Sequence, residues 1–277
     1  MNIFEFINNI KKGGILPPFD VKMILSNFYK IDIPKIIDLY DKKIEDNDLL
    51  ELDRIIRERL KGKPISKIFN EKYFWNYSFF VNENVLDPRP DSEIMIEEIL
   101  KTYKNENLNV LDLGTGSGCL IITILKLFSN FKGTGVDISE KALEVAKLNS
   151  NNLNVNNRIK FIKNNWNDGI NEKFDIIISN PPYIETDFIE KLDIDVREYD
   201  PILALDGGKD GLDCYKYLAE NLKKNCKHST KIFLEIGINQ KDNIIKIFEK
   251  NNFKFEKSAK DYGSIERILV FSNLQNN

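Results

Sequence analysis

The chain has 277 residues, of which 42% are hydrophobic and 30% charged, enough for one large domain and a small companion. A net charge of -3 gives no broad attraction to a nucleic-acid backbone, so we expect no direct nucleic-acid partner. Three widely spaced cysteines without a CxxC pair predict neither a disulfide framework nor a zinc site, and no metal is expected. The N-terminus is unlike a signal peptide, and no apolar stretch approaches the roughly 20 residues of a membrane span. We therefore expect a cytoplasmic protein without a membrane partner.

Residues 1–70 are predicted to form a small all-helical domain. Four segments in this region space their apolar residues three and four apart, as amphipathic helices do: NIFEFINNI, DVKMILSNF, IPKIIDLY and DNDLLELDRIIRERLKG. Residues 71–90 then change to aromatic and β-favouring types, with the turn-like Asn82-Glu83-Asn84 inside them. This stretch predicts a β-hairpin linker.

Residues 91–277 are predicted to form an α/β domain with a largely parallel sheet. Short apolar runs alternate with helical patterns, which is typical of buried parallel strands and their crossover helices. The predicted strands are residues 109–113, 133–138, 159–162, 174–179 and 231–236. In such sheets ligands bind where the carboxyl ends of the strands meet the loops.

A glycine-rich loop follows the first of these strands, in LDLGTGSG. Gly114, Gly116 and Gly118 allow a ligand to approach the backbone at the start of a helix. The spacing is GxGxG, which weakens a dinucleotide interpretation. Asp137, 19 residues after Gly118 and at the end of the second strand, is placed to accept hydrogen bonds from ribose hydroxyls. A tight turn needed only for packing is the alternative, but with Asp137 the pattern favours nucleoside binding.

These residues resemble the S-adenosylmethionine-dependent methyltransferases with a Rossmann-like fold. The resemblance implies that residues 114–118 (Gly114, Thr115, Gly116, Ser117 and Gly118) hold the methionine part of the donor and Asp137 its ribose. It also implies that Trp166 lies near the adenine, whereas a core tryptophan is the alternative. Asn165 stands where many relatives carry an acidic residue.

Asn180-Pro181-Pro182-Tyr183 follows the fourth predicted strand. The prolines fix φ and lack an N–H, and a residue before proline is extended, so a stiff loop presents carbonyl acceptors. The oxygen of the Asn180 side chain and a loop carbonyl, that of Pro181, suit the two hydrogens of an NH₂ group. Tyr183 suits stacking on a planar group. By itself the motif favours a simple strand terminator over a binding loop.

After the donor loop, Asn-Pro-Pro-Tyr resembles the signature of amino-group methyltransferases. Two families share it: DNA amino-methyltransferases and the release factor glutamine methyltransferases. Four further stretches resemble the second family in order and spacing: RERLKGKPISKI, FFVNENVLDPRPDSE, REYDPILALDGGKDGLDCYKYL and LEIGINQ. Asp87 stands where relatives commonly carry an apolar residue. Arg89 and Glu93 are expected either to order the site or to form a surface ion pair of little energetic value.

The resemblance implies a monomeric enzyme that methylates the glutamine of the Gly-Gly-Gln loop in class 1 peptide-chain release factors, with S-adenosylmethionine as donor and no metal. It implies that Asn180, Pro181, Pro182 and Tyr183 bind the substrate and catalyse the transfer, and that Asn180 also contacts the donor. The helical domain would dock the release factor, or it covers an apolar edge of the sheet. A DNA amino-methyltransferase and a non-catalytic donor-binding protein remain alternatives.

Overall fold

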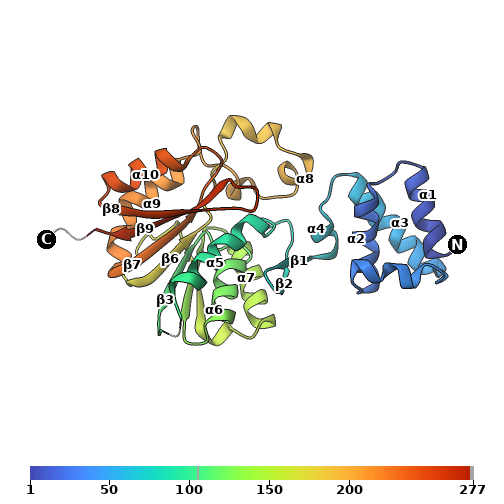
Figure 1. Cartoon of the computed structure of the whole chain (residues 1–277), viewed down its shortest axis with the longest axis horizontal. Helices are drawn as coiled ribbons and strands as arrows, with labels where there is room; N and C mark the ends of the chain where they lie inside the picture. Colours follow the sequence, from blue (N-terminus) through green and yellow to red (C-terminus); the bar gives the residue numbers. More distant parts are fainter. Residues whose placement is uncertain (105, 275–277) are drawn as a thin grey trace. The chain divides into compact units, whose positions relative to one another are not determined.

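The structure is a computed structural model that describes residues 1–104 and 106–274. It divides into two compact units (Figure 1). The helical unit comprises Met1–Asn70 and Asp193–Tyr199, and the sheet unit comprises Glu71–Leu192 and Asp200–Asn277. Within the described residues no helix is long and apolar enough to cross a membrane.

The helical unit contains the four predicted helices. They are α1 (Ile3–Lys12), α2 (Pro18–Tyr29), the 3₁₀ helix η1 (Ile33–Leu39) and α3 (Asp46–Leu60), followed by the short α4 (Ile65–Phe69). A capping box starts α1, in which the Glu5 N–H donates to Asn2 Oδ1 at 2.8 Å and the Asn2 N–H donates to Glu5 Oε2 at 3.0 Å. The apolar faces meet in one core that includes Ile3, Phe6, Ile24, Leu25, Leu52 and Ile55. This unit therefore has its own hydrophobic core.

A segment from much later in the chain completes the helical unit. It contains α8 (Ile194–Arg197). The buried Lys67 ammonium donates to the Tyr199 carbonyl, and the Tyr199 hydroxyl donates to the Lys61 carbonyl at 3.2 Å. Gly62, with φ +94°, leaves space for Ile194, because a Cβ there would lie 2.8 Å from Ile194 Cγ2. Nothing in the periodicity of the sequence indicated this arrangement.

The predicted β-hairpin exists, but its turn was placed wrongly. Strands β1 (Glu71–Phe74) and β2 (Tyr77–Phe80) pair antiparallel, and Trp75, with φ 55°, makes the turn between them. Asn82-Glu83-Asn84 follows β2, where Asn82 Oδ1 accepts from the Asn84 N–H at 3.0 Å. Phe74 and Phe79 are buried in the core of the sheet unit, to which the hairpin belongs.

The sheet unit is built on seven strands in the order β5-β4-β3-β6-β7-β9-β8. The five predicted strands are parallel: β3 (Asn109–Leu113), β4 (Lys132–Asp137), β5 (Ile159–Lys163), β6 (Phe174–Ser179) and β7 (Cys226–Glu235). Two strands that the sequence did not predict, β8 (Phe253–Lys260) and β9 (Glu266–Asn273), complete the sheet as antiparallel neighbours. The sheet is therefore largely parallel, as expected, with an antiparallel edge.

Helices cover both faces of this sheet (Figure 1). One face packs against α5 (Glu93–Thr102) and α6 (Cys119–Leu127), and the other against α9 (Asp213–Asn221) and α10 (Lys241–Lys250). Successive residues of β6 alternate between the two cores, as a strand buried on both faces requires. Helix α7 (Glu140–Asn152) packs on β5 and the hairpin. The remaining 3₁₀ turns are η2 (Pro90–Ser92), η3 (Asn156–Arg158), η4 (Thr186–Lys191), η5 (Ile202–Ala204) and η6 (Leu222–Asn225).

Candidate active site

The glycine loop and the Asn-Pro-Pro-Tyr loop leave the sheet side by side. They follow β3 and β6, which are paired with Leu113 opposite Ser179, the last residue of each strand. The buried Ser179 hydroxyl donates to the Leu113 carbonyl at 2.7 Å and ties the two strand ends together. The chain continues from β3 to β4 on one side and from β6 to β7 on the other. This is the topological switch point at which open α/β sheets bind ligands.

The glycine loop has a backbone that other residues adopt only with strain. Gly114, Gly116 and Gly118 have φ angles of +74°, +54° and +78°. The Gly114 and Thr115 N–H groups both donate to the Val136 carbonyl at 2.9 Å, which folds the loop back on β4. A Cβ on Gly118 would lie 2.7 Å from Ile122 Cδ1, whereas a Cβ on Gly116 would meet nothing within 4 Å. Gly118 is thus needed for packing, and Gly116 faces open space.

Asp137 ends β4 beside this loop. Its Oδ2 accepts from the Gly116 N–H and its Oδ1 from the Ser139 N–H, both at 2.9 Å. Burial raises the pKa of this carboxyl, and the backbone N–H groups partly offset the rise. A third backbone N–H, that of Ile138, also acts on this carboxyl. Because its two oxygens together have about four acceptor positions, the carboxylate is fixed in place and can still accept from a further donor.

A cavity of about 300 Å³ opens at this end of the sheet. Six of the predicted site residues line it: Gly114, Gly116, Asp137, Trp166, Asn180 and Pro182. Its volume lies at the lower end of the range of small-molecule sites, roughly 300–1,000 Å³. Residues from the ends of β3, β4, β5 and β6 thus meet around one space.

The other predicted site residues do not line this cavity: Thr115, Ser117, Gly118, Pro181 and Tyr183. The Thr115 hydroxyl donates to the buried Asp112 at 2.7 Å, and the Ser117 carbonyl accepts from Asn149 at 2.9 Å. Pro181 is buried, and the Tyr183 ring packs against the core that includes α9 and α10. These residues are therefore packed into the sheet unit and do not line the cavity.

Trp166 combines the two interpretations that its position allowed. It lines the cavity and also packs against the core of the sheet unit. A Cβ on Gly114 would lie 3.7 Å from Cζ3 of the Trp166 ring, an ordinary van der Waals distance, so the ring lies directly beside the glycine loop. Trp166 itself has φ 51°. The ring is held from one side and presented to the cavity on another.

Two further segments contribute to the lining, residues 84–86 and residues 201–206. Asp200 connects them, because its carboxylate accepts from Arg89 at 2.6 Å and from the Asp87 N–H at 3.4 Å. Asp87 is buried, and its carboxylate lies 3.8 Å from the Lys72 ammonium. Arg89 thus pairs with a buried carboxylate beside the cavity, and this pair is not the exposed one that was the alternative. Glu93 instead accepts from the Trp75 N–H at 2.6 Å.

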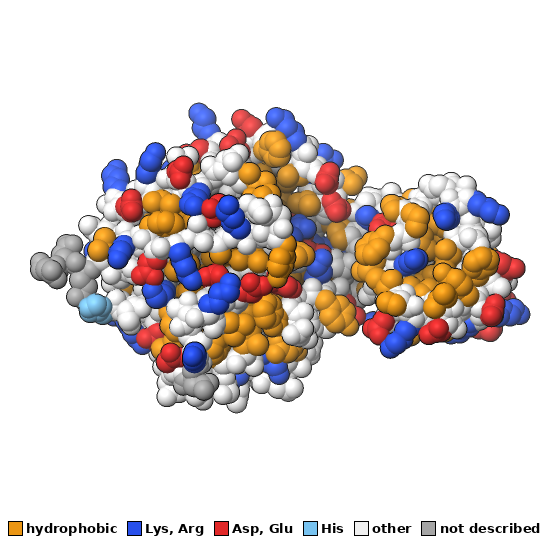
Figure 2. Space-filling view, in the orientation of Figure 1, with side chains coloured by type: hydrophobic (Ala, Val, Ile, Leu, Met, Phe, Trp, Pro, Cys, Tyr) orange, Lys and Arg blue, Asp and Glu red, His pale blue; other side chains and the backbone are white. Residues whose placement is uncertain are grey.

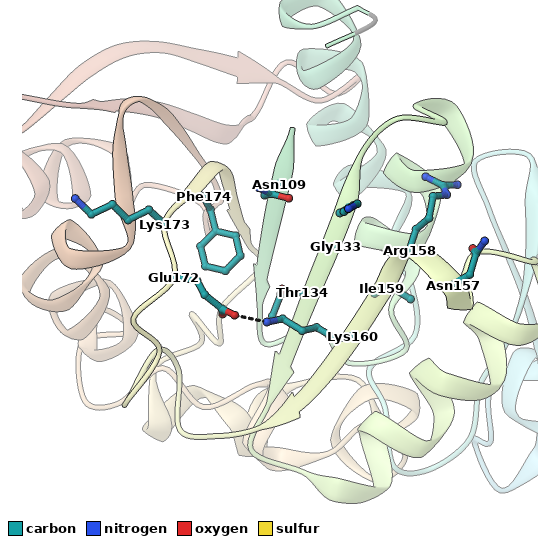
Figure 3. Close-up of a pocket in the computed structure, with 11 residues that line it drawn as sticks. Asn109, Gly133, Thr134, Asn157, Arg158, Ile159, Lys160, Glu172, Lys173 and Phe174 are labelled. Carbon is teal, nitrogen blue, oxygen red and sulfur yellow. Dashed lines mark hydrogen bonds and ion pairs between the residues drawn. The ribbon is translucent and has the colours of Figure 1, made fainter. Parts of the chain in front are cut away.

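A second cavity, of about 410 Å³, lies at the opposite end of the strands (Figure 3). None of the predicted site residues lines it. Lys160 and Glu172, which Figure 3 shows reaching toward each other, form an ion pair there. Arg158 is occupied by the carbonyls of Leu125, Phe128 and Phe131, to which its guanidinium donates. The arrangement of ion pairs and carbonyl contacts at this end accounts for these charges without a ligand.

The relatives of the chain identify its family. A release factor glutamine methyltransferase of Agrobacterium fabrum is 31% identical over 268 residues, which cover 95% of this chain and 93% of that protein. One of Buchnera aphidicola subsp. Schizaphis graminum is 36% identical over 252 residues, 91% of each chain. The chain belongs to the release factor glutamine methyltransferase family. The family and the enzyme class predicted from the sequence are thereby confirmed.

Further comparisons agree with the fold of this methyltransferase. A model of the methyltransferase small domain matches residues 83–194, a span that holds both motif loops. A solved methyltransferase from Pyrococcus furiosus is 21% identical, with a TM-score of 0.55 over 82% of this chain and 99% of that one. This likeness shows the fold, and the predicted Rossmann-like sheet with a helical N-terminal unit is confirmed.

Sequence reasoning missed one buried group next to the motif of this methyltransferase. The Asn180 amide donates through Nδ2 to the Ser92 hydroxyl at 3.3 Å, and that hydroxyl donates to Glu235. Burial raises the pKa of the Glu235 carboxyl from 4.5 to about 7. Both residues stood in stretches that carried the family resemblance, but no spacing rule connects positions so far apart. Among the described residues no cluster of His, Cys, Asp or Glu is arranged to hold a metal ion.

Proposed function

We propose that this enzyme transfers a methyl group from S-adenosylmethionine to the side-chain amide nitrogen of the glutamine in the Gly-Gly-Gln loop of a class 1 release factor. One observation carries the proposal: Asn180 and Pro182 line the same cavity as Gly114, Gly116 and Asp137. The relatives named release factor glutamine methyltransferase support the choice of acceptor. The residues proposed to bind the methyl acceptor and those proposed to bind the methyl donor then face one cavity.

The cavity fits the donor in shape and chemistry. Gly116 leaves room for the methionine part, because no atom lies within 4 Å of the position its Cβ would take. Asp137 keeps acceptor capacity for a ribose hydroxyl, and the Trp166 ring offers a flat face to the adenine. Thr115, Ser117 and Gly118 would act by holding the loop. When bound, S-adenosylmethionine supplies a methyl group on a sulfonium sulfur.

The acceptor amide needs orientation more than activation. An amide nitrogen is a poor nucleophile because its lone pair is delocalised, and methyl transfer requires approach in line with the departing sulfur. We propose that Asn180 Oδ1 and the backbone carbonyl of Pro181, a residue that is buried and does not line the cavity, each accept one hydrogen of the glutamine NH₂ group and turn its lone pair toward the methyl group. Placing the two reactants in a near-attack arrangement contributes about 7–11 kcal/mol in favourable cases. The nitrogen proton leaves after transfer, so no general base is needed beforehand.

The helical unit is proposed to dock the release factor. A glutamine on a flexible loop offers few contacts, so selection needs a larger surface. Hydrophobic side chains gather on the face of this unit that Figure 2 shows. Its exposed large apolar residues include Phe4, Phe19, Ile37, Leu50 and Leu60. An apolar docking surface of this kind suits a protein partner and not a nucleic-acid backbone.

We further propose that the enzyme works as a monomer in the cytoplasm, where release factors act. Its three cysteines are free thiols, which agrees with a reducing compartment. The overall charge of -3 disfavours duplex DNA as the acceptor.

The test is transfer of a labelled methyl group by wild type and Asn180→Ala, with purified release factor or duplex DNA as acceptor. We expect label on the release factor, loss of transfer in Asn180→Ala, and donor affinity close to wild type by calorimetry. Asn157→Ala is the matched control, because this exposed asparagine lies at the opposite end of the sheet. Label on DNA alone refutes the proposed acceptor, and full activity of Asn180→Ala refutes the mechanism.

A further inference from the structure

The side chain of Asn180 is itself held from behind by a buried pair. Its Nδ2 donates to Ser92 Oγ at 3.3 Å, and Ser92 Oγ donates to Glu235 Oε2. Ser92 ends η2 and Glu235 ends β7, and both side chains are almost fully buried. Three segments distant in sequence therefore meet directly behind the Asn-Pro-Pro-Tyr loop.

The chemistry of these three side chains fixes the direction of each hydrogen bond. A hydroxyl has one hydrogen, and an ionised carboxylate accepts only. The Ser92 hydrogen is therefore committed to Glu235, and the Ser92 oxygen meets Asn180 as an acceptor. Asn180 must turn its NH₂ group toward Ser92. Its carbonyl oxygen then faces away from Ser92, on a residue that lines the cavity.

We infer that Ser92 and Glu235 are positioning residues that fix the amide of Asn180 with its oxygen toward the acceptor nitrogen. The inference rests on the proposed function. With the amide turned over, Asn180 would present an NH₂ group to the NH₂ group of the substrate. Two donors cannot bond to each other, so the glutamine would lose one of the two contacts that aim its lone pair.

The protonation state of Glu235 decides the direction of both hydrogen bonds, the one between Glu235 and Ser92 and the one between Ser92 and Asn180. The groups that act on this carboxyl come from several elements: Asp91 from η2, Arg267 from β9, Cys119 from α6, Tyr215 from α9 and Tyr183 from the motif loop. Burial outweighs the opposing effects of Arg267, Ser92 and Asn180 and raises the pKa of Glu235 to about 7. A protonated Glu235 can donate to Ser92, which frees the Ser92 hydrogen for Asn180 Oδ1 and favours the turned amide. We therefore expect kcat to fall as the pH drops below about 7.

The experiment compares Ser92→Ala, Ser92→Thr and Glu235→Gln with wild type in transfer to the release factor. Loss of one orienting hydrogen bond sets the expected fall in kcat for Ser92→Ala at about tenfold. The KM for release factor and the Kd for S-adenosylmethionine should stay unchanged. Ser92→Thr keeps the hydroxyl and should keep wild-type kcat. Glu235→Gln should be slower and lack the decline of kcat below pH about 7.

Ser150→Ala is the matched control. Ser150 is buried in the same unit, and its hydroxyl donates only to the Lys147 carbonyl, away from the motif. It should leave kcat unchanged, which separates the loss of a buried hydroxyl from the loss of this chain of hydrogen bonds.

Three outcomes overturn the inference: wild-type kcat in Ser92→Ala, a Ser92→Thr variant as slow as Ser92→Ala, or a Kd for S-adenosylmethionine that rises in step with the loss of kcat. If wild type itself does not methylate the release factor, the proposed function and this inference fail together. An active wild type with an equally active Ser92→Ala removes the positioning role alone. The pH profile of Glu235→Gln tests the same role when Ser92→Ala folds poorly.

Discussion

Alanine at two positions of the glycine loop should have different main effects. Gly118→Ala should lower stability more, and Gly116→Ala should weaken donor binding more. Gly118→Ala forces a side chain into the left-handed region at φ +78° and places its Cβ 2.7 Å from Ile122 Cδ1 and 3.3 Å from Ala146 Cβ. Gly116→Ala meets the left-handed region at φ +54° but touches no atom within 4 Å. The first variant carries a backbone cost and a packing cost, and the second carries the backbone cost alone.

The magnitudes follow from these two contributions. The left-handed backbone costs about 1 kcal/mol in each variant. Overpacking against Ile122 adds about 2 kcal/mol to Gly118→Ala. For a unit of this size we expect Tm to fall by about 2–4 °C in Gly116→Ala and about 6–12 °C in Gly118→Ala.

Donor affinity should show the reverse order. Gly116 lines the cavity and Gly118 does not, so Gly116→Ala places a methyl group in the space proposed for the donor. We expect Gly116→Ala to raise the Kd for S-adenosylmethionine more than Gly118→Ala does, at a temperature where both are folded. Differential scanning calorimetry and titration calorimetry measure the two effects. Equal losses of Tm in the two variants, or weaker donor binding by Gly118→Ala than by Gly116→Ala, would refute the reasoning.

Three further predictions concern the Arg89–Asp200 ion pair beside the cavity, the buried Glu235 and the apolar docking surface of the helical unit. Arg89→Ala leaves Asp200, whose side chain is 2% exposed, without its guanidinium, and should lower the free energy of unfolding by about 1–3 kcal/mol and weaken donor binding, as urea unfolding and calorimetry would measure. An unchanged Kd would show that this pair does not shape the cavity. Because the pKa of Glu235 is raised from 4.5 to about 7 on folding, wild-type stability should fall as the pH rises through this window, by up to about 3 kcal/mol relative to Glu235→Gln. Urea unfolding of both proteins at about pH 5 and about pH 8 measures this, and parallel pH dependence would contradict it. Phe19→Ser with Leu50→Glu, both exposed, should raise the KM for release factor and change stability by about 0.5 kcal/mol or less. An unchanged KM would move the docking surface elsewhere.

Burial explains why several strands were predicted and why β8 was not. Strands β3 and β6 and the second half of β7 are buried on both faces and therefore read as apolar runs. Strand β8 lies at the edge of the sheet, and most of its side chains are partly or fully exposed. Its sequence, FKFEKSAK, lacks an apolar run. Strand β9 was also missed, although its residues 268–271 form a buried apolar run inside the sheet. Local patterns indicate burial, and they do not state which strands pair.

The β1–β2 hairpin and residues 193–199 show the limits of local sequence signals. Trp75 makes the hairpin turn with φ 55°, a conformation that is uncommon for tryptophan and could not be predicted from the residue type. The turn-like Asn82-Glu83-Asn84 lies beyond the hairpin. Residues 193–199 join the helical unit through a buried Lys67 and the space at Gly62. Neither contact follows from spacing along the chain.

The sequence by itself determined the two motif loops, because their constraints are local. Positive φ angles favour glycine, and consecutive prolines stiffen the loop after Asn180, so the residue types indicate the backbone conformation. Only the tertiary structure decided which distant groups stand behind those loops. Arg89 meets Asp200 across 111 positions, and Ser92 meets Glu235 across 143. Such contacts are set by the order and register of the strands, which bring buried polar groups together because each must find a partner once water is excluded.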